Sequence, residues 1–306
     1  MTDQMHVIVV MAPSGALVNR MLIENAVSAV QGQVVEAHRV AVPVSLADHR
    51  EVIKFLIDCP DPERLSAQLR QLSDEHGADI ALQSRLSRCR PYGLAVFDMD
   101  STLISCEVID ELARVAGVGA QVAEITDRAM RGELDFDESF RTRLALLEGL
   151  DAGVVDELAD QLPLQSGLSE MATTLKARGL KLATFSGGFI PIAERLKNDY
   201  GFDHVVANEL EIRGGKVTGK VVPPIVNREY KAEALGALAS RLGIHTEHCI
   251  AVGDGANDLS MMALAGLGVA FHAKPAVRAA SPIEITHIGL DGVCYLMGHE
   301  GEFAAA

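Results

Sequence analysis

Short continuous apolar runs alternate along the chain with stretches in which apolar residues recur every three or four positions. The runs are typical of buried strands, and the other stretches are typical of helices. Over residues 5–84 the order is βαββαβ, with strands predicted at 5–11, 34–44, 51–57 and 78–83 and helices at 16–30 and 60–76. In the second helix Asp61 suits the N-cap, Pro62 the first turn and Gly77 the C-terminal end. Residues 1–84 are therefore predicted to form a ferredoxin-like module.

Residues 93–306 show a second pattern, after an arginine-rich segment at 85–92 that is predicted to be a linker. Strands again alternate with helices, which favours an α/β domain with a doubly wound, mostly parallel sheet. We expect strands at 94–97, 180–185, 205–207, 249–252 and 268–271, a hairpin at 209–222, helices at 167–178, 190–200 and 231–242, and a last strand and helix near 283–297. Residues 106–165 have helical spacing without a strand. They are predicted to form a helical cap over the carboxyl edge of the sheet.

The composition narrows the functional classes. The 306 residues carry a net charge of −15, which disfavours nucleic-acid binding through a basic surface. No apolar run approaches the roughly 18 residues of a membrane span, and the N-terminus lacks a signal-peptide pattern. The five cysteines are scattered, which fits a reduced cytoplasm and offers no zinc site. We therefore expect a cytoplasmic protein without nucleic-acid or membrane partners.

Two aspartates, Asp98 and Asp100, follow the first strand of the predicted parallel sheet. Ligands of such sheets lie beyond the carboxyl ends of the strands, and alternation places both side chains on one side, with Met99 facing away. Two close carboxylates repel each other unless a cation lies between them or one is protonated. Asp98 is suited to attack phosphorus as a nucleophile, and Asp100 to carry the proton of a leaving alcohol.

Two further strand ends carry polar residues, and a lysine precedes one of them. Ser186 is followed by Gly187 and Gly188, which allow close backbone approach and offer N–H groups to an anion. Lys231 adds a positive charge that suits a phosphate. The third strand ends in Gly253-Asp254-Gly255-Ala256-Asn257-Asp258. Carboxylates that converge from separate strands suit Mg²⁺, because this ion prefers oxygen ligands.

This ordered set resembles the four motifs of the haloacid dehalogenase-type phosphatases. The resemblance covers about residues 93–298 and is carried by Asp98-Met99-Asp100-Ser101-Thr102, Ser186-Gly187-Gly188, Lys231 and Gly253 through Asp258. In detail the chain is similar to the phosphoserine phosphatase family, on the evidence of Leu103, Glu107, Phe136, Arg143 and Phe189. Met99 stands where phenylalanine is frequent in that family, which is a tolerable apolar change.

The resemblance implies a role for each matching residue. Asp98 is expected to form an aspartyl-phosphate. Asp100 is expected to act as general acid and then as base, while its backbone carbonyl binds Mg²⁺. Asp254 is expected to bind Mg²⁺ directly, with Asn257 and Asp258 supporting the metal site. The groups expected to hold the phosphoryl oxygens are Ser186, the Gly187 N–H and Lys231.

The resemblance also implies a pocket for phosphoserine under the helical cap. Glu107 would meet the substrate ammonium, and Arg143 its carboxylate, which an arginine matches in bidentate fashion. Met130 and Phe136 would close the pocket, and Asn257 would also contact the substrate. The competing interpretation of Glu107 and Arg143 is an ordinary solvated helix face.

The expected function is the Mg²⁺-dependent hydrolysis of O-phospho-L-serine to L-serine and phosphate, the last step of L-serine biosynthesis. Two alternatives remain. One is a phosphatase or phosphotransferase of the same fold that acts on another small phosphorylated metabolite. The other is a regulatory protein that senses serine. The N-terminal module resembles the ACT-type regulatory domains in topology, and topology alone leaves a homodimerising or an effector-binding role open.

Overall fold

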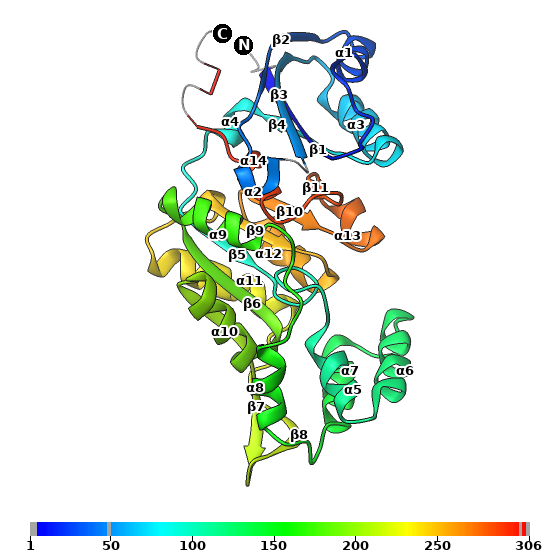
Figure 1. Cartoon of the computed structure of the whole chain (residues 1–306), viewed down its shortest axis with the longest axis vertical. Helices are drawn as coiled ribbons and strands as arrows, with labels where there is room; N and C mark the ends of the chain where they lie inside the picture. Colours follow the sequence, from blue (N-terminus) through cyan, green and yellow to red (C-terminus); the bar gives the residue numbers. More distant parts are fainter. Residues whose placement is uncertain (1–4, 48–49, 300–301, 304–306) are drawn as a thin grey trace.

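The computed structural model describes residues 5–47, 50–299 and 302–303, and it contains two sheets that lie one above the other in Figure 1. The N-terminal sheet is antiparallel and consists of β1 (Met5–Pro13), β2 (Gln33–Arg39), β3 (Arg50–Asp58) and β4 (Asp79–Ser84), in the order β2-β3-β1-β4. Two helices, α1 (Arg20–Ala29) and α3 (Pro62–His76), bury their apolar sides against one face of it. This arrangement confirms the ferredoxin-like fold.

The element ends of this module follow local chemistry. As predicted, the Asp61 side chain accepts a hydrogen bond at the start of α3, and Gly77 ends the helix with a φ of 68°. In contrast, β2 ends before its predicted boundary and is followed by α2 (Val44–Ala47). Pro43, which has no N–H to donate to a strand ladder, lies between the two. Helix α1 begins later than predicted, because the Asn19 side chain caps it.

The second sheet has seven strands in the order β11-β10-β9-β5-β6-β7-β8. These are β5 (Leu94–Phe97), β6 (Lys181–Phe189), β7 (His204–Arg213), β8 (Lys216–Val222), β9 (Cys249–Gly253), β10 (Leu267–Phe271) and β11 (Glu284–Ile285). All neighbours are parallel except β7 and β8, which form the predicted hairpin. Along β5, Leu94 and Val96 enter one apolar core, and Ala95 and Phe97 enter the other. Both faces of the sheet are therefore covered, as in a doubly wound fold.

The helices that follow these strands are α9 (Leu168–Ala177), α10 (Ile190–Tyr200), α11 (Arg228–Arg241), α12 (Leu259–Leu264), α13 (Pro275–Ala280) and α14 (Gly292–Leu296). The insert after β5 is helical as predicted and contains α5 (Val108–Val115), α6 (Gly119–Met130), α7 (Phe136–Ala145) and α8 (Gly153–Ala159). In Figure 1, α5, α6 and α7 form a separate group beside the lower part of the second sheet. Within the described ranges, no helix has the length and apolar character needed to cross a membrane.

The predicted linker is a packed part of the boundary between the two sheets. Its first half forms the short helix α4 (Arg85–Arg88), and Arg88 is only 1% exposed. The guanidinium pairs with Glu302 and donates to the backbone carbonyls of Tyr295, Leu296 and Met297. On the other side of the boundary, Asp79 of β4 accepts from the N–H groups of Thr286, His287 and Ile288. These charged hydrogen bonds join the module firmly to the second sheet.

Candidate active site

The carboxyl ends of three adjacent strands, β9, β5 and β6, meet at one edge of the second sheet. Asp98 follows β5, Asp254 follows β9, and Ser186 lies near the end of β6. Lys231 reaches the same place from the first turn of α11. Asp98, Ser186 and Asp254 thus lie at converging strand ends, the usual ligand position of a parallel sheet, and Lys231 joins them from a helix.

The Asp98 carboxylate is buried and held on one oxygen. Its Oδ1 accepts from the Met99 N–H at 2.8 Å and from Lys231 Nζ at 2.7 Å. Burial and the carboxylate of Asp258 raise the pKa of Asp98 well above its ordinary value, and Lys231 opposes that rise. The local fold thus fixes one oxygen and leaves Oδ2 as the atom that can react or bind a ligand.

Lys231 is fully buried between two carboxylates. Its Nζ donates to Asp98 Oδ1 and to Asp258 Oδ1, both at 2.7 Å. Burial by itself would lower the pKa of Lys231, but Asp258 and Asp98 outweigh it and raise the pKa. The ammonium is therefore charged at neutral pH. Asp258 is held in turn, because its Oδ2 accepts from the Gly255 N–H at 3.0 Å.

Three of the carboxylates are placed to hold a cation. Asp98, Asp254 and Asp258 each offer an oxygen, and these oxygens lie within 4.8 Å of one another. Burial and the charge of Asp258 raise the pKa of Asp254 to about 7, so a nearby positive charge would favour its ionised form. A hard divalent cation would supply that charge, so the donor set fits such an ion. Asp258, expected only to support the metal site, is as close as the other two.

Asp100 has the environment that a general acid needs. Burial, Glu107 and Asp98 all raise the pKa of Asp100 well above its ordinary value. Its Oδ1 is enclosed and has no hydrogen-bond partner among the described residues. A carboxyl group with a raised pKa keeps its proton to a higher pH, which favours donation of that proton to a substrate oxygen.

The Ser186-Gly187-Gly188 segment belongs to the strand that was expected to end at residue 185. Strand β6 continues through it to Phe189, with a shift of register toward β7. The Gly188 N–H donates to Ser186 Oγ at 2.7 Å. A Cβ on Gly188 would lie 2.6 Å from Met99 Cε and 2.9 Å from Asp100 Oδ2, so the close approach of this segment to the two aspartates requires glycine there.

The cap helices bring further predicted residues to this edge. A Cβ on Gly187 would lie 3.4 Å from Phe136 Cζ, so the first residue of α7 covers the segment. Glu107, just before α5, accepts from Ser101 Oγ at 3.0 Å. Burial lowers the pKa of Arg143, and the nearby charge of Glu107 opposes this decrease. The Nε of Arg143 has no hydrogen-bond partner among the described residues. An enclosed guanidinium N–H without a partner is available to donate to an acceptor on a bound ligand.

Not every predicted residue is brought together. Met130 ends α6 with 71% of its surface exposed, and no described contact joins it to the other candidate residues. Asn257 lies in a short 3-10 helix after β9, η2 (Ala256–Asp258), and is half-buried. Sequence reasoning missed Asp110, one helical turn after Glu107, whose charge acts on both Glu107 and Arg143. Its i, i+3 spacing from Glu107 is the signal that would have identified it.

The comparisons agree with this geometry. A family model for haloacid dehalogenase-like hydrolases matches residues 92–266. Phosphoserine phosphatase SerB2 of Mycobacterium tuberculosis is 46% identical over 243 residues, which are 79% of this chain and 59% of that protein. A phosphoserine phosphatase of Archaeoglobus fulgidus is 40% identical, over 82% of this chain and 74% of its own length. The chain thus spans less than two thirds of the mycobacterial relative and about three quarters of the archaeal one.

A solved structure extends the likeness to nearly the whole chain. The unliganded form of a probable phosphoserine phosphatase from Vibrio cholerae matches with a TM-score of 0.75 and 35% identity. The match covers 95% of this chain and 86% of that one, so it includes the N-terminal module as well as the second sheet.

Proposed function

We propose that this chain, which belongs to the haloacid dehalogenase-like hydrolases, hydrolyses O-phospho-L-serine to L-serine and phosphate. The observation that carries the proposal is the Asp98 carboxylate, with one oxygen fixed by Lys231 and the other uncommitted, beside Asp100, whose pKa is raised well above its ordinary value. This reaction would be the last step of L-serine biosynthesis.

The proposed reaction has two steps. In the first, Asp98 Oδ2 attacks phosphorus, an aspartyl-phosphate bond forms, and the ester P–O bond of the substrate breaks. Asp100 gives its proton to the departing seryl oxygen. In the second, Asp100 takes a proton from water, whose oxygen attacks phosphorus, and the bond to Asp98 breaks. Ser186, the Gly187 N–H and Lys231 would hold the phosphoryl oxygens throughout.

We propose Mg²⁺ as the metal. The carboxylates of Asp98 and Asp254 and the backbone carbonyl of Asp100 would hold it, with Asn257 and Asp258 supporting them. The ion would supply positive charge against the phosphoryl oxygens, which bear the negative charge of the reaction. The three buried acidic side chains within 4.8 Å support this proposal, because only hard oxygen ligands are present.

The choice of phosphoserine rests on the cap. Its ammonium group would meet Glu107, whose position is set by Ser101, and its carboxylate would meet Arg143. The unpartnered Arg143 Nε supports this assignment, since a carboxylate would give it an acceptor. Phe136 would cover the bound substrate, with Asn257 at its side. Met130 would contribute only after a movement of the cap, given its exposed position.

The test is phosphate release from O-phospho-L-serine, with Mg²⁺ and with EDTA, by the wild-type protein and by Asp98→Asn. We expect release that requires the metal and is lost in the variant. Phosphate release only from other phosphate esters would support a phosphatase activity but exclude O-phospho-L-serine as its substrate. No release from a panel of phosphate esters, by protein shown to be folded, would reject the enzyme function.

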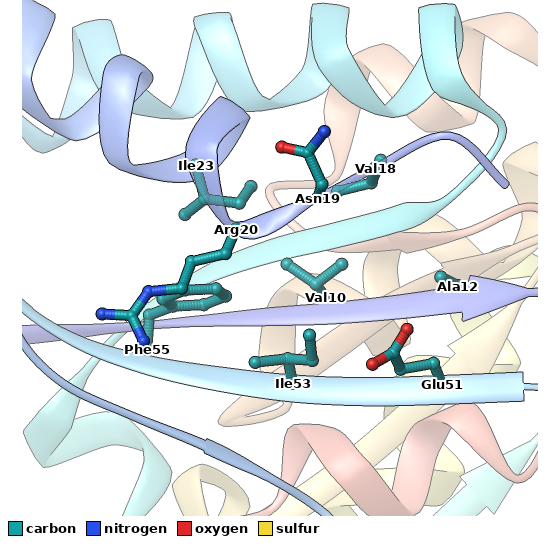
Figure 2. Close-up of a pocket in the computed structure, with 9 residues that line it drawn as sticks. All are labelled: Val10, Ala12, Val18, Asn19, Arg20, Ile23, Glu51, Ile53 and Phe55. Carbon is teal, nitrogen blue, oxygen red and sulfur yellow. The ribbon is translucent and has the colours of Figure 1, made fainter.

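The second candidate, a serine sensor, has less support. The cavity between α1 and the N-terminal sheet is lined by Val10, Ala12, Val18, Asn19, Arg20, Ile23, Glu51, Ile53 and Phe55 (Figure 2). Its volume is about 10 Å³, which is room for a single water molecule and not for an amino acid. Calorimetry with L-serine would test this, and saturable binding outside the active site would revive the candidate.

We propose a homodimer through the N-terminal module. Strand β2 is an edge strand, and its Val35 is 48% exposed, whereas the opposite edge at β4 lies against residues 284–288. An edge strand with unpaired backbone groups can pair with a second copy. Light scattering of wild type and Val35→Lys would test the dimer. The proposed biosynthetic role suggests the cytoplasm, which fractionation of cells would test.

A further inference from the structure

A buried side chain outside the predicted site forms a hydrogen bond with Ser186-Gly187-Gly188, the segment proposed to bind phosphate. Asn208 lies in β7 and is fully buried. Its Nδ2 donates to the Gly187 carbonyl at 2.7 Å, and its Oδ1 accepts from the Val226 N–H at 2.8 Å. Because one end must donate and the other must accept, the amide has a single satisfied orientation.

The Gly187 carbonyl belongs to the same peptide unit as the Gly188 N–H. That N–H donates to Ser186 Oγ at 2.7 Å. Asn208 therefore holds one side of a rigid, planar unit whose other side holds the serine hydroxyl. Since Ser186 Oγ already accepts a hydrogen bond, its own proton is available to an oxygen of a bound phosphoryl group.

The segment needs this support because the strand ladder does not supply it. Phe185 pairs with Val206 and Phe189 pairs with Asn208, so the three residues between them face a single residue of β7. The ladder hydrogen bonds are interrupted over this bulge. Two consecutive glycines have wide backbone freedom, so the interruption leaves the segment free to rotate unless another group fixes it.

We propose that Asn208 is a positioning residue that orients the Ser186 hydroxyl toward the phosphoryl group. The inference rests on the proposed phosphatase function. Asn208 acts through the peptide between Gly187 and Gly188 and makes no contact with the serine part of the substrate. Its loss should therefore weaken the handling of every phosphate ester by the same factor.

The test uses Asn208→Asp, which keeps the shape and the acceptor for Val226. When ionised, the new carboxylate cannot donate to the Gly187 carbonyl. We expect kcat/KM to fall about 10- to 100-fold, equally for O-phospho-L-serine and p-nitrophenyl phosphate, as for the loss of a buried hydrogen bond. The affinity for inorganic phosphate, measured by calorimetry, should fall in parallel. Asn198→Asp, on the exposed surface of α10, is the matched control and should leave both unchanged.

A pH series separates positioning from general destabilisation. At low pH the introduced acid is protonated and can donate again, so the ratio of variant to wild-type activity should rise as the pH falls. The melting temperature is followed in parallel, with all assays below the lowest value. Asn208→Leu, which is similar in volume and cannot ionise, is the second variant and should lose activity equally at every pH.

Three results would overturn the inference. The first is that both folded variants, Asn208→Asp and Asn208→Leu, keep kcat/KM and phosphate affinity within about twofold of wild type. The second is a loss of activity on only one of the two substrates. The third is a ratio of Asn208→Asp to wild-type activity that stays constant across the pH series. Failure of the proposed substrate is a separate outcome. If the wild type cleaves only p-nitrophenyl phosphate, that substrate and inorganic phosphate still test Asn208.

Discussion

Lys231 Nζ donates a 2.7 Å hydrogen bond to Asp98 Oδ1, although 133 residues separate the two in the chain. The same oxygen accepts from the Met99 N–H, so the carboxylate is fixed on one side and uncommitted on the other. The ammonium also donates to Asp258 and neutralises part of the charge of that carboxylate. A single buried lysine therefore orients the proposed nucleophile and makes the close approach of the carboxylates tolerable.

The first prediction concerns this lysine. Lys231→Met removes the counter-charge and a phosphate contact, and we expect kcat/KM to fall about 10²- to 10³-fold. Without metal, the variant should also melt at a lower temperature, because the carboxylates repel each other. Adding Mg²⁺ should raise its melting temperature more than that of wild type. Lys220→Met, at an exposed position, is the control. An equal response to Mg²⁺ in the variant and the wild type would contradict the argument.

The second prediction concerns substrate choice. Arg143→Ala removes the proposed partner of the substrate carboxylate. Because a charged hydrogen bond is lost, we expect kcat/KM for O-phospho-L-serine to fall about 10- to 100-fold. Little should change for p-nitrophenyl phosphate, which has no carboxylate. Arg141→Ala on the same helix is the control, because Arg141 is 60% exposed and faces Asp137. Equal losses on the two substrates would show that Arg143 does not read the carboxylate.

The third prediction compares two glycines. A methyl group at Gly188 would lie 2.6 Å from Met99 Cε and 2.9 Å from Asp100 Oδ2, so Gly188→Ala must displace groups around the proposed general acid. We expect kcat to fall by about tenfold or more. Gly236→Ala lies inside α11, where the nearest atom would be 4.0 Å from the new methyl group. That variant should keep its activity and gain about 0.5–1 kcal/mol of stability from helix propensity.

Steady-state kinetics and denaturant unfolding on both glycine variants check this prediction. Full activity in Gly188→Ala would mean that the segment has more room than the structure indicates.

The fourth prediction concerns pH and the boundary between the two sheets. Burial alone would raise the pKa of Glu302, but Arg88 and Lys54 outweigh it and lower the pKa below its ordinary value. A carboxylate with a lowered pKa in the folded protein stabilises it above the ordinary glutamate pKa, and this contribution is lost as the pH falls through the lowered value. Glu302→Gln should therefore reduce the free energy of unfolding by about 1–3 kcal/mol at pH 7.

The difference between wild type and Glu302→Gln should shrink as the pH falls below 4. Urea unfolding at a series of pH values measures it. The control is Glu24→Gln, whose exposed pair with Arg20 should contribute less than about 1 kcal/mol. A difference independent of pH would show that Glu302 acts through its shape rather than its charge.

Local sequence signals predicted the elements and several of their ends. Asp61 and Gly77 bound a helix because their preferences act within one helical turn of their own position. The apolar run before Asp98 predicted a buried strand, and the polar residues after it predicted a ligand site, because parallel sheets gather their carboxyl ends on one edge.

Other features had no local signal. The extension of β6 through Ser186-Gly187-Gly188 goes beyond the strand predicted at 180–185, because pairing with β7 resumes at Phe189. Arg88, in the segment predicted to be a linker, is buried against carbonyl groups more than 200 residues away. No periodicity in the sequence separates such an arginine from an exposed one.

The sequence by itself determined the order of the elements, the two-part organisation and the types of residue at the strand ends, since these depend on neighbours along the chain. Only the tertiary structure decided which oxygen of Asp98 is held, which groups are left without partners in the cap, and that Asn208 donates to the Gly187 carbonyl. Such contacts join residues distant in sequence, and their hydrogen-bond geometry is fixed only when the strands and helices have packed.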